Sequence, residues 1–424
     1  MPIRSPVPPR RLASILAAAL LLAACNPPAP SGAPPSSADA PSPSSPASSP
    51  PASTAPAAQV YGAIRRQVEA IRGLQPTADV DPVTIDATQL RTNLTAEFDA
   101  ANTTANLEFS QDELETLGLL PKGSSLRDVT LDFQSASVAG YYSPDKKQLF
   151  VVSRSGGLGP AEEVTYAHEF THQLTDQHFD LAKLGSDATH QSDRALAQLS
   201  LIEGDAVSAQ TTWTIENLTP QEMGQLLSAS LDPAALAALQ RAPAYLRETA
   251  LFPYQGGLGF ITSLLSSGAY AAVDAAYGNP PESTEQILHP EKYAAGEAPT
   301  VVKIPKLFDP GLPAGWKARG QDTLGELVLR LWLTQGGVPA VQATAAAAGW
   351  GGDRLELYDS PNGRSVLLVT EWDRLTDAAE FAAAARTALV GLGLKGDVVF
   401  DEAAPTVYVT FGDDAGEITP RFFR

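Results

Sequence analysis

Residues 161–180 read AEEVTYAHEFTHQLTDQHFD and hold three of the five histidines of the chain. His168 and His172 are four residues apart, and Glu169 directly follows the first of them. Side chains four residues apart lie on one face of a helix, so both imidazoles can contact a single metal ion. The positions around them are mostly apolar or small, which favours a buried metal site over an exposed helix that carries histidines by chance.

Glu169 stands where the catalytic base of such a site is expected. Zinc accepts imidazole nitrogen and carboxylate oxygen, and a catalytic zinc site keeps one position open for water. The metal lowers the pKa of that water towards about 7, so a neighbouring carboxylate can take its proton. On the helix, Glu169 lies beside the metal face, and we therefore expect it to activate a zinc-bound water.

Two residues compete for the place of the third metal ligand. His178 is six residues past His172, but on a continuous helix it points about 120° away from the metal face. Thr175 stands where a turn out of the helix would favour glycine. Glu203 belongs to a largely apolar helix that is predicted to start near Ser192. A buried carboxylate is costly unless it meets a cation, so Glu203 is the preferred ligand and His178 remains the alternative.

The two residues after Glu203 extend this prediction. Gly204 weakens the helix, which is explained if another backbone must approach closely at this point. Asp205 is two residues from Glu203 and cannot share its face. We expect Asp205 to hydrogen-bond a ligand histidine, and the alternative is that it replaces Glu203 as the ligand.

The sequence HEFTH at residues 168–172, with Glu203 downstream in a Glu-Gly-Asp-Ala setting, resembles the gluzincin group of zinc metallopeptidases. The resemblance implies that two histidines and a glutamate bind one Zn²⁺ ion and that the glutamate of the motif is the base. It also implies a zincin-like domain with a small sheet over the active-site helix. Thermolysin-like members carry an aspartate four residues after the ligand glutamate, where this chain has Val207, so the ligands must be supported differently here.

The same resemblance implies where substrate would be held. In this group a strand upstream of the motif forms the rim of the cleft and pairs with substrate, so we expect Tyr142, in AGYYSPDKKQLFVV, to line the cleft. A tyrosine or histidine usually donates to the developing oxyanion, and the candidates are Tyr254 and His289. The alternatives are a packed aromatic residue for Tyr254 and a histidine that caps a turn for His289.

The N-terminus has the pattern of a lipoprotein signal peptide over residues 1–24. A basic start precedes a 13-residue apolar run, LASILAAALLLAA, which is too short to span a bilayer. The run ends at Cys25, the only cysteine, in a Leu-Ala-Ala-Cys sequence that resembles the bacterial lipobox. We expect a lipid on Cys25 that anchors the exported protein to the outer face of a bacterial membrane. The alternative is an ordinary cleavage site with Cys25 incidental.

The segment after the signal and the net charge limit the partners. Residues 25–57 are almost entirely Pro, Ala and Ser and predict a disordered tether. Loss of residues 1–24 removes three arginines and no acid, which changes the formal net charge from −19 to −22. Such a charge repels nucleic acid and anionic lipid, so we expect no nucleic-acid partner.

The remainder of the chain predicts an α+β protein in two parts. Residues 58–307 are mainly helical in pattern, with a β-hairpin predicted at 137–142 and 148–153. We expect this part to be the metallopeptidase domain. Residues 308–424 combine strand-like and helix-like segments and predict a smaller α+β module without recognisable chemistry.

Together these features predict zinc-dependent hydrolysis of a peptide or protein substrate by a membrane-anchored, extracytoplasmic endopeptidase. The alternative is a zinc-containing lipoprotein that acts as a scaffold or assembly factor; Glu169 argues against it, because a structural site needs no base. A solute-binding lipoprotein would show strands alternating with helices in two lobes, which this sequence lacks. The chain has no Gly-x-Ser-x-Gly element and its one cysteine has another expected role, so serine or cysteine catalysis is not expected.

Overall fold

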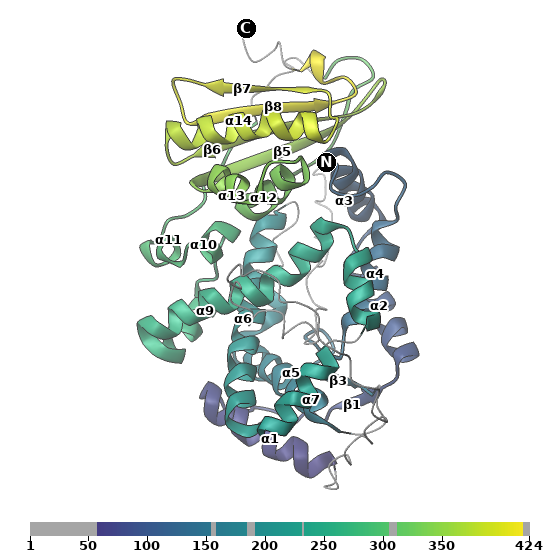
Figure 1. The fold of residues 1–424 in the computed structure, drawn as a ribbon, viewed down its shortest axis with the longest axis vertical. Helices are drawn as coiled ribbons and strands as arrows, with labels where there is room; N and C mark the ends of the chain where they lie inside the picture. The colour runs from purple at the N-terminus through teal and green to yellow at the C-terminus, as the bar shows by residue number, and fades with distance from the viewer. Residues whose placement is uncertain (1–56, 154–157, 185–190, 231–232, 305–311, 419–424) are drawn as a thin grey trace, which may run out of the picture.

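The computed structural model describes residues 57–153, 158–184, 191–230, 233–304 and 312–418. Within these ranges the chain is α+β, as the sequence predicts (Figure 1). A mainly helical part with a small sheet precedes a smaller part built on a five-stranded sheet. The predicted signal peptide at residues 1–24, Cys25 and all but the last residue of the predicted tether at 25–57 lie outside the described residues.

The first part consists of helices around a three-stranded sheet. Its helices, in chain order, are α1 (Ala57–Arg72), α2 (Ala87–Ala101), α3 (Thr104–Leu117), α4 (Leu126–Ser137), α5 (Pro160–Phe179), α6 (Ser192–Asn217), α7 (Pro220–Ser230), α8 (Pro233–Arg241), α9 (Ala244–Gly278), α10 (Thr284–Leu288) and α11 (Pro290–Ala295), with a 3₁₀ turn at Leu181–Lys183. Its strands are β1 (Val83–Ile85), β2 (Gly140–Ser143) and β3 (Gln148–Val152). The hairpin predicted upstream of the histidine motif is confirmed as β2 and β3.

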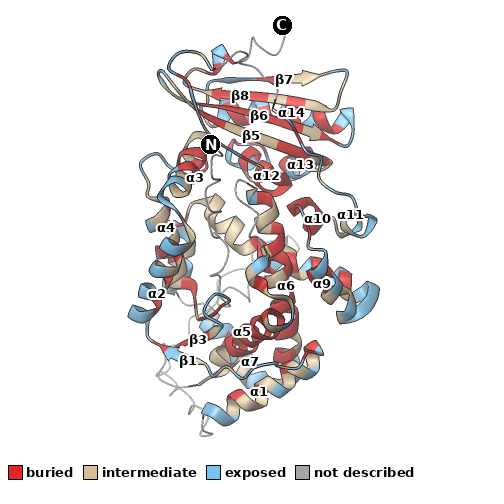
Figure 2. Cartoon of the chain, turned by 180° about the vertical axis from the view of Figure 1, so that it is seen from behind, coloured by how far each residue is buried: buried red, intermediate tan, exposed pale blue. Residues whose placement is uncertain are grey.

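Helix α5 carries the histidine motif and is largely buried. At its start, Glu162 accepts a hydrogen bond from the backbone N–H of Gly159 at 3.1 Å. At its end, Asp180 adopts a left-handed backbone (φ 53°), which stops the helix. Residues 164–176 are buried without interruption, because α1, α6 and the small sheet all pack on this helix (Figure 2).

The small sheet is ordered β1-β3-β2, with β1 parallel and β2 antiparallel to the central strand β3. Strand β2 is therefore an edge strand, and it lies directly on α5. A Cβ atom at Gly140 would lie 2.7 Å from Cγ2 of Thr165 and 2.9 Å from the carbonyl oxygen of Phe150. Only glycine fits at this position. Because glycine has no side chain, β2 can pack against the turn of α5 that carries Glu169.

Helices α6 and α9 touch backbone to backbone, which confirms the close approach predicted at Gly204. A Cβ atom at Gly204 would lie 2.3 Å from the carbonyl carbon of Gly257, and one at Gly257 would lie 2.2 Å from the carbonyl oxygen of Ser200. Neither helix can accept a methyl group here. The contact fixes the distance between the two helices one residue after Glu203.

Helix α9 bends near its C-terminal end. Gly268 and Ala269 have non-helical backbone angles, and the positive φ of Ala269 (53°) is costly for a residue with a side chain. By length and composition alone, α9 is apolar enough to cross a membrane. The break in its backbone and its close contact with α6 instead make it part of the folded body.

The second part is an antiparallel sheet covered on one face by helices (Figure 1). The strand order is β4-β5-β6-β8-β7. Its elements are β4 (Lys317–Asp322), α12 (Gly325–Gln335), α13 (Ala340–Ala347), β5 (Trp350–Ser360), β6 (Gly363–Trp372), α14 (Leu375–Gly391), β7 (Gly396–Asp401) and β8 (Thr406–Gly412), followed by a 3₁₀ turn at Ala415–Glu417. The helices and the sheet enclose the largest apolar core of the chain.

The two parts meet at the start of α6. Asp322, the last residue of β4, accepts a hydrogen bond from the backbone N–H of Ser192 at 2.9 Å, and also contacts the hydroxyl of Ser192. Ser192 is the first residue of α6. A side chain that accepts from the first N–H groups of a helix stabilises its N-terminus. The second part therefore caps the helix that carries Glu203.

Gly257→Ala should destabilise the protein by at least about 2 kcal/mol, because the new methyl group would have to push α9 away from α6. The control is Gly259→Ala on the same helix, where a Cβ atom meets nothing within 4 Å. That change should be neutral or stabilising by up to about 1 kcal/mol, since alanine favours a helix more than glycine does. Urea unfolding measures both, and equal stabilities of the two variants would contradict the close contact.

A buried acid lies near the boundary between the two parts. Glu113 of α3 is 4% exposed, and its Oε1 atom has no hydrogen-bond partner among the described residues. Burial first, and then the charges of Asp322 and Asp353, raise the pKa of Glu113 well above its usual value. The folded-state pKa thus exceeds the unfolded-state value of about 4.3, so this group makes the protein less stable as the pH rises above that value.

Glu113→Gln should remove this part of the pH dependence and raise stability at neutral pH by about 1–3 kcal/mol, because no charge is then buried. The matched control is Glu108→Gln, the same change at an exposed position of the same helix. Urea midpoints measured from about pH 5 to about pH 8 provide the comparison. If the two variants keep the same slope with pH, Glu113 is not the responsible group.

Candidate metal centre

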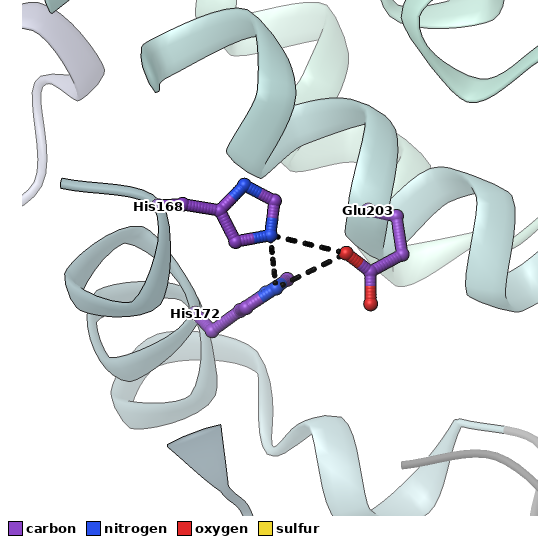
Figure 3. A group of neighbouring side chains, drawn as sticks. All are labelled: His168, His172 and Glu203. Atoms are coloured by element: carbon purple, nitrogen blue, oxygen red, sulfur yellow. Dashed lines mark hydrogen bonds and ion pairs between the residues drawn. The ribbon is translucent and has the colours of Figure 1, made fainter. Parts of the chain in front are cut away.

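Three side chains from two helices converge on one point (Figure 3). His168 and His172 extend from α5, and Glu203 extends from α6. The Nε2 atoms of the two histidines are 3.0 Å apart, and Oε2 of Glu203 lies 3.2 Å from Nε2 of His168 and 3.3 Å from Nε2 of His172. The structure therefore brings together the three predicted ligand residues in an arrangement that could hold a metal ion.

The group is buried, and its charges are strongly coupled. His168, His172 and Glu203 are 0%, 6% and 4% exposed. Burial acts to raise the pKa of Glu203, but the charge of His172 and hydrogen bonds with both histidines outweigh it and lower that pKa to about 2. Glu203 is thus an anion held between two imidazoles.

Glu169 lies beside this group and is not fully paired. It is 1% exposed, and its Oε1 atom has no hydrogen-bond partner among the described residues. Burial raises the pKa of its carboxyl to about 8; the charge of Glu203 also raises it, whereas His168 and the backbone N–H of Tyr142 lower it. A buried carboxyl oxygen without a partner costs free energy, so it marks a position where a further group belongs.

Gln210 fixes the orientation of the first histidine. The Nδ1–H group of His168 donates to Oε1 of Gln210 at 2.9 Å, which leaves the lone pair of Nε2 facing the other two residues. Sequence reasoning missed Gln210. The available signal was its spacing, because Gln210 follows Glu203 by seven residues, or two helical turns, and so lies on the same face of α6.

The predicted role of Asp205 is wrong. Its carboxylate does not reach a ligand histidine; it accepts from Nε of Arg72 at 3.0 Å and from the hydroxyl of Tyr277 at 3.0 Å. Burial raises the pKa of Asp205, and the charge and hydrogen bond of Arg72 act against that increase. The physical reason is helical spacing: Asp205 is two residues from Glu203 and therefore faces the other side of α6.

Of the two candidate oxyanion donors, Tyr254 lies at the site. Its ring stacks on that of His168, with centroids 6.1 Å apart. Its hydroxyl is buried and lies close enough to Glu203 to interact with that carboxylate. Burial, followed by the charges of Glu203 and Glu169, raises the pKa of Tyr254 well above 10, so the hydroxyl keeps its proton and can donate it in a hydrogen bond.

The other two histidine candidates point elsewhere. His289 lies between α10 and α11, where its Nε2 atom is 3.2 Å from Oε1 of Glu326 on α12, so its predicted role as oxyanion donor is wrong. Helices α10 and α11, which flank it, lie beside the second part of the chain and away from α5 (Figure 1). His178 is exposed and its Nε2 atom contacts the carbonyl oxygen of Gln75 at 2.8 Å, so it is not the third ligand. Helix α5 continues through this position, as expected without a glycine turn.

Tyr142 contributes its backbone rather than its side chain. The ring is buried, and the hydroxyl donates to Oδ2 of Asp176 at 2.7 Å, so any contribution of Tyr142 to a substrate cleft comes from its backbone. Burial and the hydrogen bond to Asp176 raise the pKa of this hydroxyl far above its usual value. The backbone N–H of Tyr142 instead reaches Glu169.

A second group of carboxylates does not form a comparable site. Glu285, Glu297 and Asp373 each have an oxygen 2.7 Å from Nζ of Lys292. The ammonium group already lies where a metal ion would have to bind. We interpret this group as an ion-pair cluster that joins the α10–α11 region to the second part of the chain.

Comparisons with known proteins identify only the C-terminal part. Residues 313–419 match the family model of a domain of unknown function (DUF8575). Comparison with curated proteins found no match, and neither did comparison with solved structures. The residues of the metal centre lie outside the matched range, so their function is inferred from their own geometry.

Gln210→Leu should weaken zinc binding about 10- to 100-fold, because His168 loses the partner that fixes its protonation and ring orientation. Competition with a chromophoric chelator measures the dissociation constant. The control is Thr212→Ala, a small change on the same helix at a residue whose hydroxyl donates to the backbone carbonyl of Ser208. A Gln210 variant that binds zinc as tightly as this control would show that the hydrogen bond is unimportant.

Proposed function

We propose that this protein is a zinc-dependent metallopeptidase of the gluzincin type. His168, His172 and Glu203 would hold one Zn²⁺ ion. Zinc bonds of about 2.0–2.1 Å in a tetrahedron separate neighbouring ligand atoms by about 3.3–3.4 Å. The three separations of 3.0, 3.2 and 3.3 Å are close to that value, and this agreement is the observation that carries the proposal.

The protonation of the three groups also supports a cation between them. His168 uses its Nδ1 proton for Gln210, so its Nε2 atom carries a lone pair. Nε2 of His172 and the ionised Glu203 carboxylate converge on the same point. A divalent cation at that point would take the lone pair of His168 and satisfy the anionic carboxylate together with His172.

The remaining side chains of the site suit peptide hydrolysis. Zinc, when bound, supplies a Lewis acid that polarises the substrate carbonyl group and acidifies a water molecule. In its ionised form, which a divalent cation beside it would favour, Glu169 takes the proton of the attacking water through its unpaired Oε1 atom and delivers it to the leaving nitrogen. Tyr254 donates its hydroxyl to the substrate oxygen as negative charge develops. Gln210 keeps His168 in the required tautomer throughout.

A peptide substrate is favoured by the position of β2 at the edge of its sheet beside Glu169, although all four residues of this strand are buried in the structure. The backbone N–H of Val152 bonds to the carbonyl of Ala139, so in this antiparallel pair the backbone groups of Gly140 and Tyr142 point away from β3. The bond from the N–H of Tyr142 to Glu169 agrees with this direction. An extended peptide would have to displace the groups that bury this edge before it could pair with it through main-chain hydrogen bonds beside the catalytic base.

We further propose export and lipid attachment through Cys25, with a Pro/Ala/Ser-rich tether that holds the folded body away from the membrane. Support comes from the sequence: the short apolar run, the lipobox-like residues 22–25 and the composition of the segment that follows. Peptide or protein substrates outside the cytoplasm would then be the natural targets.

A non-catalytic zinc lipoprotein remains the second candidate, and one observation favours it. The three ligand residues are between 0% and 6% exposed, as is usual for a structural metal site that no substrate reaches. The unpaired Oε1 atom of Glu169 favours the catalytic proposal, because a structural site has no use for it.

Glu169→Gln should abolish hydrolysis of a peptide library, with a loss of at least about 10³-fold in kcat/KM, because no base remains to take the proton. Zinc content should stay near one ion per chain, since Glu169 is not a ligand. Metal analysis and cleavage assays on the same wild-type and variant preparations make the comparison.

The matched control is Glu163→Gln, the same change on α5 at a residue outside the metal group. It should keep both zinc and activity. A Glu169→Gln variant that cleaves peptides at the wild-type rate would refute the proposed mechanism, and a wild type that binds zinc without any hydrolysis would favour the scaffold role.

A further inference from the structure

Helix α1 lies across both helices that carry the metal centre, on the side away from the ligands. Tyr61 packs on Tyr166 of α5, with ring centroids 4.2 Å apart, and Nε of Arg65 donates to the hydroxyl of Tyr166 at 2.7 Å. On the α6 side, Gln67 accepts from the indole N–H of Trp213 at 2.9 Å. A single helix thus contacts α5 and α6 together.

The last residue of α1 makes the strongest of these contacts. Arg72 is 1% exposed, and its Nε atom lies 3.0 Å from Oδ2 and 2.9 Å from Oδ1 of Asp205 on α6. Asp205 is 0% exposed. Removing one member of a buried ion pair leaves the other charge without compensation, so the pair strongly resists separation.

The distal end of α9 completes the enclosure of Arg72. Nη2 of Arg72 donates to Oδ1 of Asp274 at 2.6 Å, and the guanidinium lies 4.6 Å from the centroid of the Tyr270 ring. Tyr277 donates to Asp205 and stacks on Phe179 at the end of α5, with centroids 4.5 Å apart. These residues follow the break in α9, which turns this end of the helix towards Arg72.

This network can affect the metal centre because Asp205 and Glu203 lie on the same helix. Two residues apart on a helix, their side chains point about 160° away from each other around the axis. Glu203 faces the histidines of α5, and Asp205 faces Arg72. Any rotation of α6 about its axis that displaced the Glu203 carboxylate would also pull Asp205 away from Arg72.

We propose that Arg72 is a positioning residue for the metal centre, which fixes the rotation of α6 and thereby holds Glu203 at bonding distance from the ion. The inference rests on the proposed function only in that it requires the metal to bind. The inference also assigns a role to α1, the first described helix after the predicted tether, because α1 contacts both helices that carry ligand residues.

The test uses the chain from residue 26 onward, with Arg72→Met, Arg72→Lys and Asp274→Asn variants. Zinc dissociation constants come from competition with a chromophoric chelator, and the visible spectrum of the Co²⁺-substituted protein reports the ligand geometry. Urea unfolding of the zinc-free proteins measures stability separately. Asp274 is the control because it bonds the same guanidinium but its side chain is 38% exposed and lies on α9 rather than α6.

Arg72→Met should weaken zinc binding about 10- to 100-fold and alter the Co²⁺ spectrum, as expected for loss of a group that supports a ligand. Arg72→Lys should lie between this variant and the wild type, because an ammonium group restores the charge but not the planar geometry. Asp274→Asn should bind zinc within about 3-fold of the wild type, since α6 keeps its pair with Arg72.

A purely structural role would give a different result: Arg72→Met would unfold at lower urea but bind zinc with the wild-type dissociation constant and spectrum, and the inference would be wrong. If Arg72→Met does not fold, Arg72→Met combined with Asp205→Asn removes the unpaired buried charge. That double variant should fold and still bind zinc at least about 10-fold more weakly. Wild-type zinc affinity in it would overturn the inference.

The outcomes separate this inference from the proposed function. If the wild type binds zinc and the Arg72 variants bind it equally well, only the positioning role fails. If the Arg72 variants lose zinc affinity but the wild type cleaves no peptide, the positioning role stands and the peptidase proposal fails. A wild type that binds no zinc removes both.

Discussion

The buried charge of Glu203 constrains how the first part of the chain packs, because this carboxylate must stay between two imidazoles. A buried carboxylate loses several kcal/mol of hydration, and it recovers this only if its partners stand at hydrogen-bond or coordination distance. Helices α5 and α6 must therefore keep a fixed separation and rotation. Gly140 and Gly204 serve this requirement by letting a strand and a helix approach without side chains. Glycine stands at these two positions because a neighbouring strand or helix must approach closely there, and not because the local backbone conformation favours it.

The two possible roles of the site make opposite demands on its surroundings. A structural ion is best enclosed by ligands whose neighbours are all satisfied, and the burial of His168, His172 and Glu203 fits that description. A catalytic ion needs polar groups held ready for atoms that arrive later, and the unpaired Oε1 atom of Glu169 fits that description. The second feature is the more informative, because unsatisfied buried oxygens are costly and are rare without a reason.

Sequence reasoning succeeded where the chemistry is local to one helix and failed where a distant element decides. His168, Glu169 and His172 follow from helical spacing, and the hairpin and the α+β class follow from periodicity. Glu203 was predictable as an acid in an apolar helix. Asp205 was assigned to the wrong partner because Arg72, 133 residues earlier, is the residue that neutralises it. Nothing in the sequence around these positions indicates that α1 folds back across α6, and Gln210 carries no distinctive local pattern.

The hydrogen bond from Ser192 to Asp322 has a consequence for the domain of unknown function. Sequence families are often treated as portable units that can be moved between chains or expressed alone. Here the matched segment provides the acceptor that terminates a helix outside its own limits, and that helix carries Glu203. Cutting the chain at the family boundary would leave the backbone N–H of Ser192 without this acceptor. The limits of sequence similarity therefore do not coincide with the limits of the contacts that stabilise α6.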